Sequence, residues 1–330
     1  MHRTSALAVA ALGSLVASGA FAAPAAAYPD KPLRWIIPFP PGGSNDVLGR
    51  YLGEKLTDRL HQQVVIDNRG GANGSIGAEL AAQSPADGYT LLMISTSFVM
   101  NAAVRTLPYD VERSFDPIAT IASSPNCIVV SPKSGISSVK DLVERAKAAP
   151  GKLSYASTGV GGFNHFGGEL FKTTTGANIV HVPYRGGGPA MTDLMANQVP
   201  IMFSSVTQVL PNVRTGRLKM IAVGAAHRSP AVPDVPTVAE SGYPGYEVSV
   251  WWAVAAPAGI PRKVTATLGK AFAAILDDAD TRQRLARDAA EPLQMKPADI
   301  RKMIHAEVQK WIDVARTAHI TVPGAKTAAR

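Results

Sequence analysis

The 330-residue sequence has one cysteine, few aromatic residues and, after residue 27, no apolar run long enough to span a bilayer. A single cysteine, Cys127, excludes an internal disulfide bond. It lies in the apolar run 127–130, where we expect a small buried hydrophobic side chain and not a reactive thiol. The composition is otherwise that of an ordinary globular protein.

Positive charge is in excess but is not concentrated. The formal charge is +8 at pH 7, and Lys and Arg are spread along the chain. No dense basic run with interleaved aromatic residues occurs, so we expect no nucleic acid partner. Two interpretations of the charge stay open: a general field that attracts small anions, and a surface charge that keeps the protein in solution.

The motifs of several enzyme classes do not occur either. Neither Ser44 nor Ser75 lies in a Gly-x-Ser-x-Gly elbow, and there is no phosphate loop that ends in Gly-Lys-Ser/Thr. Asn164 interrupts the Gly-x-Gly-x-x-Gly spacing that begins at Gly159. The histidines after residue 27 have no metal-ligand spacing. We therefore expect no catalytic residue, no metal and no cofactor, and an enzyme is the less favoured alternative.

The first 27 residues have the layout of a secretory signal peptide. Arg3 gives a short positive start, and the apolar run 7–20 is short for a membrane span. Small residues favour cleavage before Tyr28, although a cut after Ala22 or Ala23 stays open. A retained membrane anchor is the alternative. We expect an exported, periplasmic protein from which this segment has been removed.

Two stretches of the chain are built on the same plan of strand, Gly-rich turn, helix and second strand. The first runs from Arg34 to Gly71 and the second from Lys152 to Gly187. Each turn would aim free backbone N–H groups and a positive helix end at one point, which suits an anion. Two such units suggest two lobes that grip an acid from opposite sides.

The alternation of strands and helices predicts an α/β protein with mostly parallel sheets covered by helices on both faces. About 300 residues follow the N-terminal segment, which favours two lobes. We expect residues 28–124 with 250–330 to form lobe 1 and residues 125–249 to form lobe 2. Two chain crossings then make a two-strand hinge, and the ligand crevice lies between the lobes.

Seven motifs occur along the sequence: PFPPGGSND at 38–46, NRGGANG at 68–74, DGYTL at 87–91, PYD at 108–110, YASTGVG at 155–161, HVPYRG at 181–186 and PDVPTVAE at 233–240. In this order and spacing they resemble the substrate-binding receptors of tripartite tricarboxylate transporters, the Bug family. The resemblance covers nearly the whole chain after residue 27. It implies a type II periplasmic-binding-protein fold with two Rossmann-like lobes that close on a carboxylate and present it to a membrane permease.

The resemblance also implies the class of ligand and of partner. Family members bind citrate-like acids, dicarboxylates, acidic amino acids or aromatic acids. The transporter is driven by an ion gradient, so no nucleotide site is expected. We expect a monomeric receptor whose partners are a small organic carboxylate and the permease subunits. A periplasmic subunit that reports its ligand to a membrane sensor is the alternative.

Two anchors carry the expected ligand site. The first consists of Phe39, Gly42, Gly43, Ser44 and Asp46, and the second of Ser157, Thr158, Gly159, Gly161, Gly162, Phe163 and His165. We expect Asp46 to orient the loop by accepting from its N–H groups, and a plain helix cap stays open. For His165, a structural hydrogen bond within the loop stays open beside a ligand role.

Further candidates lie outside the two anchors. Ser95 and Thr96 follow a buried strand, where open α/β sheets bind ligands, although a helix cap is an equal alternative. Tyr184 and Arg185 form a further wall; Arg185 either pairs with a second carboxylate or lies on the solvated surface. Ser204 stands where an acidic residue is common in the family, which weakens the case for a ligand with an ammonium group.

Apolar residues near the hinge shape the expectation for the ligand. Gly162 stands where Ser or Thr is frequent in the family, so one hydroxyl is lost. Phe163, Trp251 and Trp252 add apolar surface, which favours a carboxylate with a flat or apolar body, aromatic acids included. Packing of both tryptophans within the hinge is the alternative.

Overall fold

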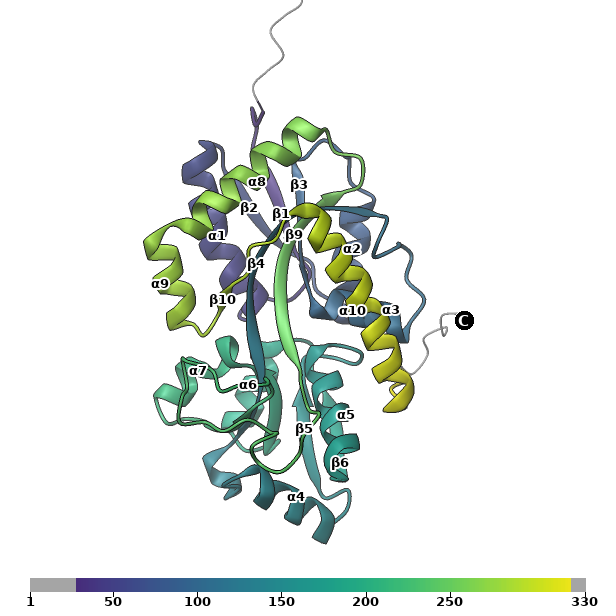
Figure 1. Ribbon diagram of the computed structural model, residues 1–330, viewed down its shortest axis with the longest axis vertical. Helices are drawn as coiled ribbons and strands as arrows, with labels where there is room; N and C mark the ends of the chain where they lie inside the picture. The colour runs from purple at the N-terminus through teal and green to yellow at the C-terminus, as the bar shows by residue number, and fades with distance from the viewer. Residues whose placement is uncertain (1–27, 322–330) are drawn as a thin grey trace, which may run out of the picture.

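The computed structural model describes residues 28–321, so the expected signal peptide lies outside the described residues. Lobe 1 and lobe 2 lie one above the other in Figure 1 and share one mixed sheet of ten strands. The strand order is β2-β1-β3-β9-β4-β7-β5-β6, and β8 and β10 pair with β4. None of the helices within residues 28–321 is both long and apolar enough to cross a membrane.

The elements lie in two groups above and below the middle of the sheet in Figure 1, and the names lobe 1 and lobe 2 are used for these groups. Lobe 1 is built from β1 (Leu33–Ile37), α1 (Ser44–Leu60), β2 (Val64–Asn68), η1 (Ala72–Gly74), α2 (Ser75–Ala82), β3 (Thr90–Ser95), α3 (Thr96–Val104), α8 (Arg262–Asp277), α9 (Ala279–Arg287), β10 (Glu291–Pro292) and α10 (Pro297–Thr317). Lobe 2 is built from η2 (Pro132–Ser134), α4 (Val139–Ala148), β5 (Leu153–Ser157), α5 (Phe163–Thr175), β6 (Ile179–Pro183), α6 (Gly187–Met195), β7 (Ile201–Ser205), α7 (Val206–Arg214) and β8 (Lys219–Val223).

The two similar stretches of sequence fold alike. β1 pairs with β2 and β5 pairs with β6, in each case in parallel and with a helix as the crossover. Parallel pairing needs such a crossover, and the Gly-rich turn lets each helix start directly after its strand. The carboxyl ends of β1 and β5 therefore both lead to the region between the lobes, where α1 and α5 begin.

Two long strands connect the lobes: β4 (Phe115–Val130) and β9 (Ser249–Pro257). They lie side by side in Figure 1 and run antiparallel. The first part of β4, Phe115–Pro125, pairs with β9, and its last part, Asn126–Val130, pairs with β7. The two lobes are thus joined by the backbone of β4 and β9 and also by an uninterrupted series of hydrogen bonds between strands.

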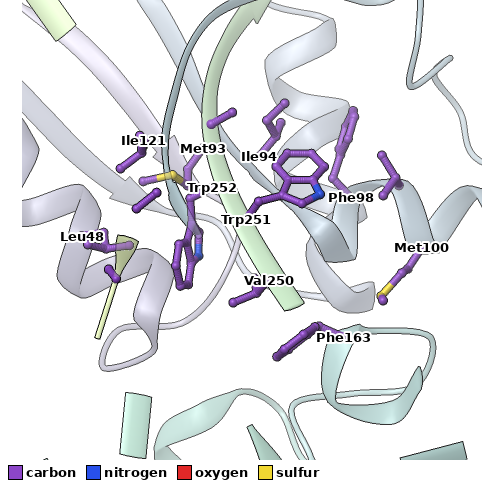
Figure 2. Close-up of a cluster of buried hydrophobic side chains, with 14 of the residues drawn as sticks. Leu48, Met93, Ile94, Phe98, Met100, Ile121, Phe163, Val250, Trp251 and Trp252 are labelled. Carbon is purple, nitrogen blue, oxygen red and sulfur yellow. The ribbon is translucent and has the colours of Figure 1, made fainter. Parts of the chain in front are cut away.

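The tryptophans on β9 belong to the core of lobe 1. Adjacent residues of a strand point to opposite faces, and Figure 2 shows the two indole rings on opposite sides of β9. Trp251 is 6% exposed and donates its Nε1–H to Glu307 Oε2 of α10 at 3.4 Å, and Trp252 is fully buried. Neither lines the cavities between the lobes, so the expectation that they add apolar surface to the ligand site is wrong.

Cys127 lies on β4 and is fully buried, as predicted for a small hydrophobic side chain. Burial raises the pKa of its thiol far above the ordinary value, which keeps the sulfur protonated.

Candidate functional site

Five helices begin around a small inner chamber between the lobes: α1, α3, α5, α6 and α7. The chamber has a volume of about 40 Å³. One water takes roughly 10–15 Å³ of such space, so about three heavy atoms fit, the size of one carboxylate group. Both lobes contribute its walls, which consist of Phe39, Pro40, Gly43, Ser44, Asn45, Ser95, Ser97, Thr158, Phe163, Asn164, Gly187, Ser205, Gln208 and Val250.

The electrostatics of the inner chamber favour an anion. The residues that directly precede α1, α3, α5 and α6 provide no side-chain cap, although the Phe163 N–H at the start of α5 donates to Ser97 Oγ of the other lobe at 3.1 Å. Unpaired N–H groups and the helix dipole give each of these ends a partial positive charge. No acidic side chain is among the wall residues. Convergent positive helix ends in walls that carry no carboxylate are a suitable site for a carboxylate or a similar anion.

The first anchor is held by Asp46, which lies in the first turn of α1. Its carboxylate accepts the Gly42 N–H at 3.0 Å and the Asn68 Nδ2–H at 2.9 Å, and it pairs with Arg50 at 3.0 Å. Burial opposes its ionisation, but these bonds outweigh burial and hold the pKa below its usual range. Asp46 therefore orients the loop, as expected, while the N–H of Gly42 (φ +87°) is used within the turn.

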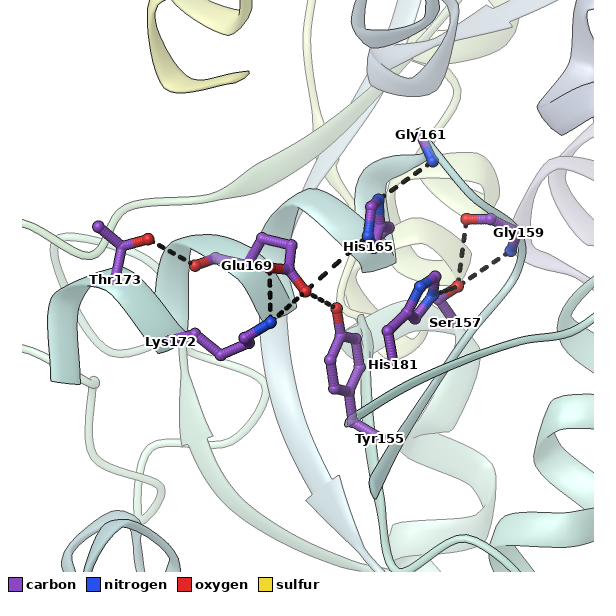
Figure 3. A network of polar contacts seen from close by, with 9 residues as sticks. All are labelled: Tyr155, Ser157, Gly159, Gly161, His165, Glu169, Lys172, Thr173 and His181. Carbon is purple, nitrogen blue, oxygen red and sulfur yellow. Dashed lines mark hydrogen bonds and ion pairs between the residues drawn. The ribbon is translucent and has the colours of Figure 1, made fainter. Parts of the chain in front are cut away.

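The second anchor satisfies most of its polar groups internally, as Figure 3 shows. The Oγ of Ser157 is fully buried, lies 2.6 Å from His181 Nε2 and accepts the Gly159 N–H at 3.2 Å. His165 Nδ1 accepts the Gly161 N–H at 3.2 Å. Ser157 and His165 thus lie behind the loop and fix its shape, and neither lines a cavity between the lobes.

The two histidines behind this loop are neutral at neutral pH. Their rings stack with centroids 4.1 Å apart. Burial, with Lys172 nearby, lowers the pKa of His165 to about 4. Burial, with His165 as neighbour, lowers the pKa of His181 to about 3. Neutral rings can accept hydrogen bonds from the loop, which a protonated ring cannot do.

At the ends of β3 and β7, one of the residues that line the chamber is the neighbour of the residue expected there: Ser97 in place of Thr96, and Ser205 in place of Ser204. Ser95 and Ser97 line the inner chamber, but Thr96 is buried, where its Oγ1 accepts the Trp251 N–H at 2.9 Å. Ser204 is fully buried and lies 3.2 Å from Gln208 Oε1. Its neighbour Ser205 faces the chamber and caps α7 instead.

Gln208 is a wall residue that the sequence motifs do not indicate. Its Nε2 is buried and has no hydrogen-bond partner among the described residues. A Cβ on Gly187 would lie 2.2 Å from this Nε2, so only glycine at this position leaves room for the amide. The Gln208 amide is therefore a donor directed at the inner chamber, on the side where α6 and α7 begin.

A larger outer cavity of about 780 Å³ adjoins the same loops. Small-molecule sites span roughly 300–1,000 Å³, so the outer cavity is large enough for the body of a metabolite. Phe39, Pro40 and Thr158 line both the chamber and the cavity. The other walls include Asn73, Arg105, Val160, Pro183, Tyr184, Arg185 and Gly186, and no wall residue is acidic.

Arg105 bridges the two lobes at this cavity. Its Nη1 donates to Ala72 O of lobe 1 at 3.2 Å and its Nη2 to Val160 O of lobe 2 at 2.8 Å. Its Nε is buried without a partner among the described residues. Burial lowers the pKa of the guanidinium, which makes no ion pair with a carboxylate of the described residues and stays charged. No motif singles out Arg105, because its role depends on the approach of the other lobe.

Replacing Arg105 with methionine should weaken carboxylate binding by about tenfold, because the closed arrangement loses the bond to Val160. A hydrogen bond from a charged group contributes roughly 1.5–3 kcal/mol, and about 1.4 kcal/mol corresponds to tenfold. Calorimetric titration with one carboxylate measures the change. Arg217→Met, at an exposed arginine of lobe 2, is the matched control and should leave affinity unchanged. Equal affinity in wild type and Arg105→Met would contradict the bridging role.

The structure therefore separates the predicted site residues into two groups. Those that line the chamber or the cavity are Phe39, Gly43, Ser44, Ser95, Thr158, Gly159, Phe163, Tyr184 and Arg185. Those that lie outside both linings are Gly42, Asp46, Thr96, Ser157, Gly161, Gly162, His165 and Ser204. Within residues 28–321, no group of three or more His, Cys, Asp or Glu side chains is arranged to hold a metal ion.

Comparison with known proteins identifies the family. The profile described as "Tripartite tricarboxylate transporter family receptor" matches residues 48–319. BugT of Bordetella pertussis is 38% identical over 321 residues, which cover 96% of this chain and 98% of BugT.

Solved structures agree with this. The structure of R. palustris Rpa4515 with adipate has a TM-score of 0.87 and 35% identity, and covers 89% of this chain and 99% of that one. MatC (Rpa3494) from Rhodopseudomonas palustris with bound malate has a TM-score of 0.83 and 27% identity, and covers 87% of this chain and 99% of that one. These likenesses confirm the predicted periplasmic-binding-protein fold. The chain belongs to the family of tripartite tricarboxylate transporter receptors, and it is a solute-binding receptor of that family.

Proposed function

We propose that this receptor captures a small organic carboxylate between its lobes and delivers it to the permease subunits of a tripartite tricarboxylate transporter. The carboxylate group occupies the inner chamber, and the body of the ligand extends into the outer cavity. The protein works in the periplasm as a monomer, and it binds its ligand without transforming it.

The observation that carries this proposal is the convergence of helix starts from both lobes on a chamber of carboxylate size. α1 and α3 come from lobe 1, and α5, α6 and α7 come from lobe 2. An anion in the chamber therefore contacts both lobes and favours the closed arrangement over an open one. The adipate and malate bound by the two solved relatives support the choice of anion.

The division of the chain is part of the proposal. Residues 28–124 with 250–330 form lobe 1, and residues 125–249 form lobe 2. The pairing of β4 supports the first boundary, because its partner changes from β9 to β7 between Pro125 and Asn126. The second boundary lies at the start of β9, where Ser249 pairs with Pro125.

The walls favour an acid with a flat or apolar body. Phe39 and Phe163 border the inner chamber, and Pro40, Pro41 and Pro183 line the outer cavity. No acidic side chain lines either space, so an ammonium group on the ligand would have no charged partner. These walls support simple dicarboxylates and aromatic acids over amino acids.

The Ser157–His181 pair supports binding rather than catalysis. Its 2.6 Å separation is that of a nucleophile and a base. However, Ser157 is fully buried, so its hydroxyl is not accessible to a substrate. His181, with a pKa of about 3, is also too weak a base to activate this hydroxyl.

A ligand panel tests the proposal. We expect adipate and an aromatic acid such as terephthalate to raise the unfolding temperature by about 4 °C at a hundredfold excess over Kd, since ligand binding then adds about 2.7 kcal/mol. The dimethyl esters should have no effect, because they cannot supply an anion. Differential scanning calorimetry gives the result. Stabilisation by citrate or glutamate but by no aromatic or apolar acid would refute the ligand class, and stabilisation by the esters would refute the anion site.

A further inference from the structure

We propose that lobe 1 contains a second, independent binding site for an amphiphilic organic anion, a molecule with an apolar body and one carboxylate or sulfonate. The site is a groove of about 620 Å³ between α8, the first half of β4 and the segment from Gln294 to Pro297. We call it the α8 groove. It has no wall in lobe 2 and shares no residue with the inner chamber or the outer cavity.

The floor of the α8 groove is apolar and recessed because the helix side that faces it has short side chains. α8 presents small residues along the side that faces the groove, among them Ala266, Gly269 and Ala273. A Cβ on Gly269 would lie 3.8 Å from Ile118 O, so α8 runs close over β4 at this point. Ile118 and Met295 complete the apolar lining. Short side chains on the helix leave space that a flat ring or an alkyl chain can fill.

Three cations without acidic partners surround this apolar floor: Arg262, Lys270 and Lys296. Among the described residues, none of the three takes part in an ion pair. The two acids next to the groove have partners other than these three cations. Asp277 accepts from Arg282 at 2.7 Å and from Gln294 at 3.1 Å, and Asp299 pairs with Lys302 at 3.4 Å. The charge of the three cations is therefore available to an anion.

Two helix starts add to this positive potential. α8 begins at Arg262 and α10 at Pro297, and both residues line the groove. Neither helix has a side-chain cap on its first N–H groups. The positive ends of two long helices thus coincide with the unpaired cations. An apolar floor with a cationic border recognises a ligand that is apolar on one side and anionic on the other.

The α8 groove should bind its ligand in the open and the closed arrangement alike. All of its walls belong to lobe 1, so its ligand has no differential contact with the two arrangements and cannot shift their balance. This separates the groove from the proposed carboxylate site, and the inference does not depend on the proposed function.

The probe 1-anilinonaphthalene-8-sulfonate, an aromatic sulfonate, tests the site on the full chain after residue 27 at pH 7. We expect one bound probe per chain by fluorescence and calorimetric titration. Lys270→Glu should weaken this binding at least tenfold. Lys263→Glu makes the same charge change at an exposed residue of α8 outside the groove, and should weaken it less than twofold. Equal losses in the two variants, or no bound probe in the wild type, would overturn the proposal.

Two further measurements locate the probe. Ala273→Phe fills the floor of the groove and should abolish binding of the probe. Circular dichroism shows whether this variant folds. If it does not, the comparison of Lys270→Glu with Lys263→Glu tests the location of the probe. Octanoate should displace the probe at a concentration at least tenfold below that of octanol, because only octanoate is an anion. Displacement of the probe by adipate would place it in the cleft between the lobes and refute the α8 groove.

Discussion

Replacing Gly162 with valine should hold the lobes apart and weaken carboxylate binding by about 10- to 100-fold. Gly162 lies in lobe 2 directly before α5, and a Cβ there would lie 2.3 Å from Asn73 Oδ1 of lobe 1. The φ of Gly162 is −103°, so valine does not strain the backbone. The valine side chain therefore destabilises only the arrangement in which the two lobes are in contact. Overpacking costs about 1–3 kcal/mol, and each 1.4 kcal/mol corresponds to about a tenfold change in affinity.

Asn73 has little freedom to yield to the new side chain. It is 9% exposed, its Nδ2 donates to Asn101 Oδ1 at 3.3 Å, and its backbone oxygen accepts from Asn101 Nδ2 at 2.9 Å. The hydrogen bond from the Phe163 N–H to Ser97 Oγ, 3.1 Å long, lies next to the contact and also joins the lobes. A wedge at Gly162 therefore also lengthens this bond.

Small-angle scattering and calorimetric titration measure the two consequences. The variant should keep the scattering curve of an open molecule at a ligand concentration that closes the wild type. Asn73→Gly combined with Gly162→Val should restore affinity, because Asn73 has φ +55°, which glycine adopts without cost. Gly188→Ala is the matched control, since a Cβ there lies at an ordinary 3.9 Å from Pro41 O of the other lobe. Full affinity in Gly162→Val would show that the Asn73 contact does not limit closure.

Lowering the pH from 7 to 4 should remove on the order of 3 kcal/mol of unfolding free energy through His165 alone. Its pKa is about 4 in the folded protein and about 6.5 when unfolded. A lowered histidine pKa means that the unfolded chain binds the proton first. The contribution is therefore complete above pH 6.5 and is lost as the pH falls toward 4. His181, with a pKa of about 3, adds a loss in the same direction.

The groups that face the histidine pair set the size of this effect. Lys172 disfavours a charge on either ring, while Glu169 favours one on His181. Glu169 is already engaged, because its Oε1 accepts the Tyr155 hydroxyl at 2.7 Å and its Oε2 pairs with Lys172 at 2.8 Å (Figure 3). The carboxylate therefore does not compensate fully for a proton on the rings.

Urea unfolding at pH 7, 5.5 and 4.5 tests this dependence. His181→Phe keeps a ring stacked on Tyr155, whose centroid lies 5.0 Å away, and removes one titrating group. It should be less stable than the wild type at pH 7 but lose less stability on acidification. The same acid loss in His181→Phe and the wild type would exclude His181 as one of its sources, and a wild type that loses no stability between pH 7 and 4.5 would contradict the role of His165.

The sequence permits prediction of the fold because its signals are local. A strand, a Gly-rich turn and a helix follow one another within about fifteen residues around Gly42 and again around Gly161, and a crossover helix leaves few topologies for the strands on either side. The role of Asp46 is equally local, because its partner Gly42 is four residues away.

The parts of the site that could not be predicted depend on contacts between distant segments. Ser97 accepts from Phe163, 66 residues further along the chain, and Arg105 donates to Val160, 55 residues away. Nothing near Ser97 or Arg105 indicates these partners. The direction of side chains along a strand can be predicted in part, because successive residues point to opposite faces. This alternation places Ser205, not Ser204, at the chamber, and it directs Trp251 and Trp252 to opposite faces of β9. The sequence does not tell which of the two faces meets the chamber.

The paired strands β4 and β9 limit how the molecule can move. A flexible loop would let the two halves swing and twist in many directions, whereas two strands that are hydrogen-bonded along their length cannot slide past each other or separate without breaking those bonds. Successive cycles of capture and release should then retrace one path and return the halves to the same mutual orientation. A transporter that contacts both halves would meet a single reproducible outline each time a loaded receptor arrives.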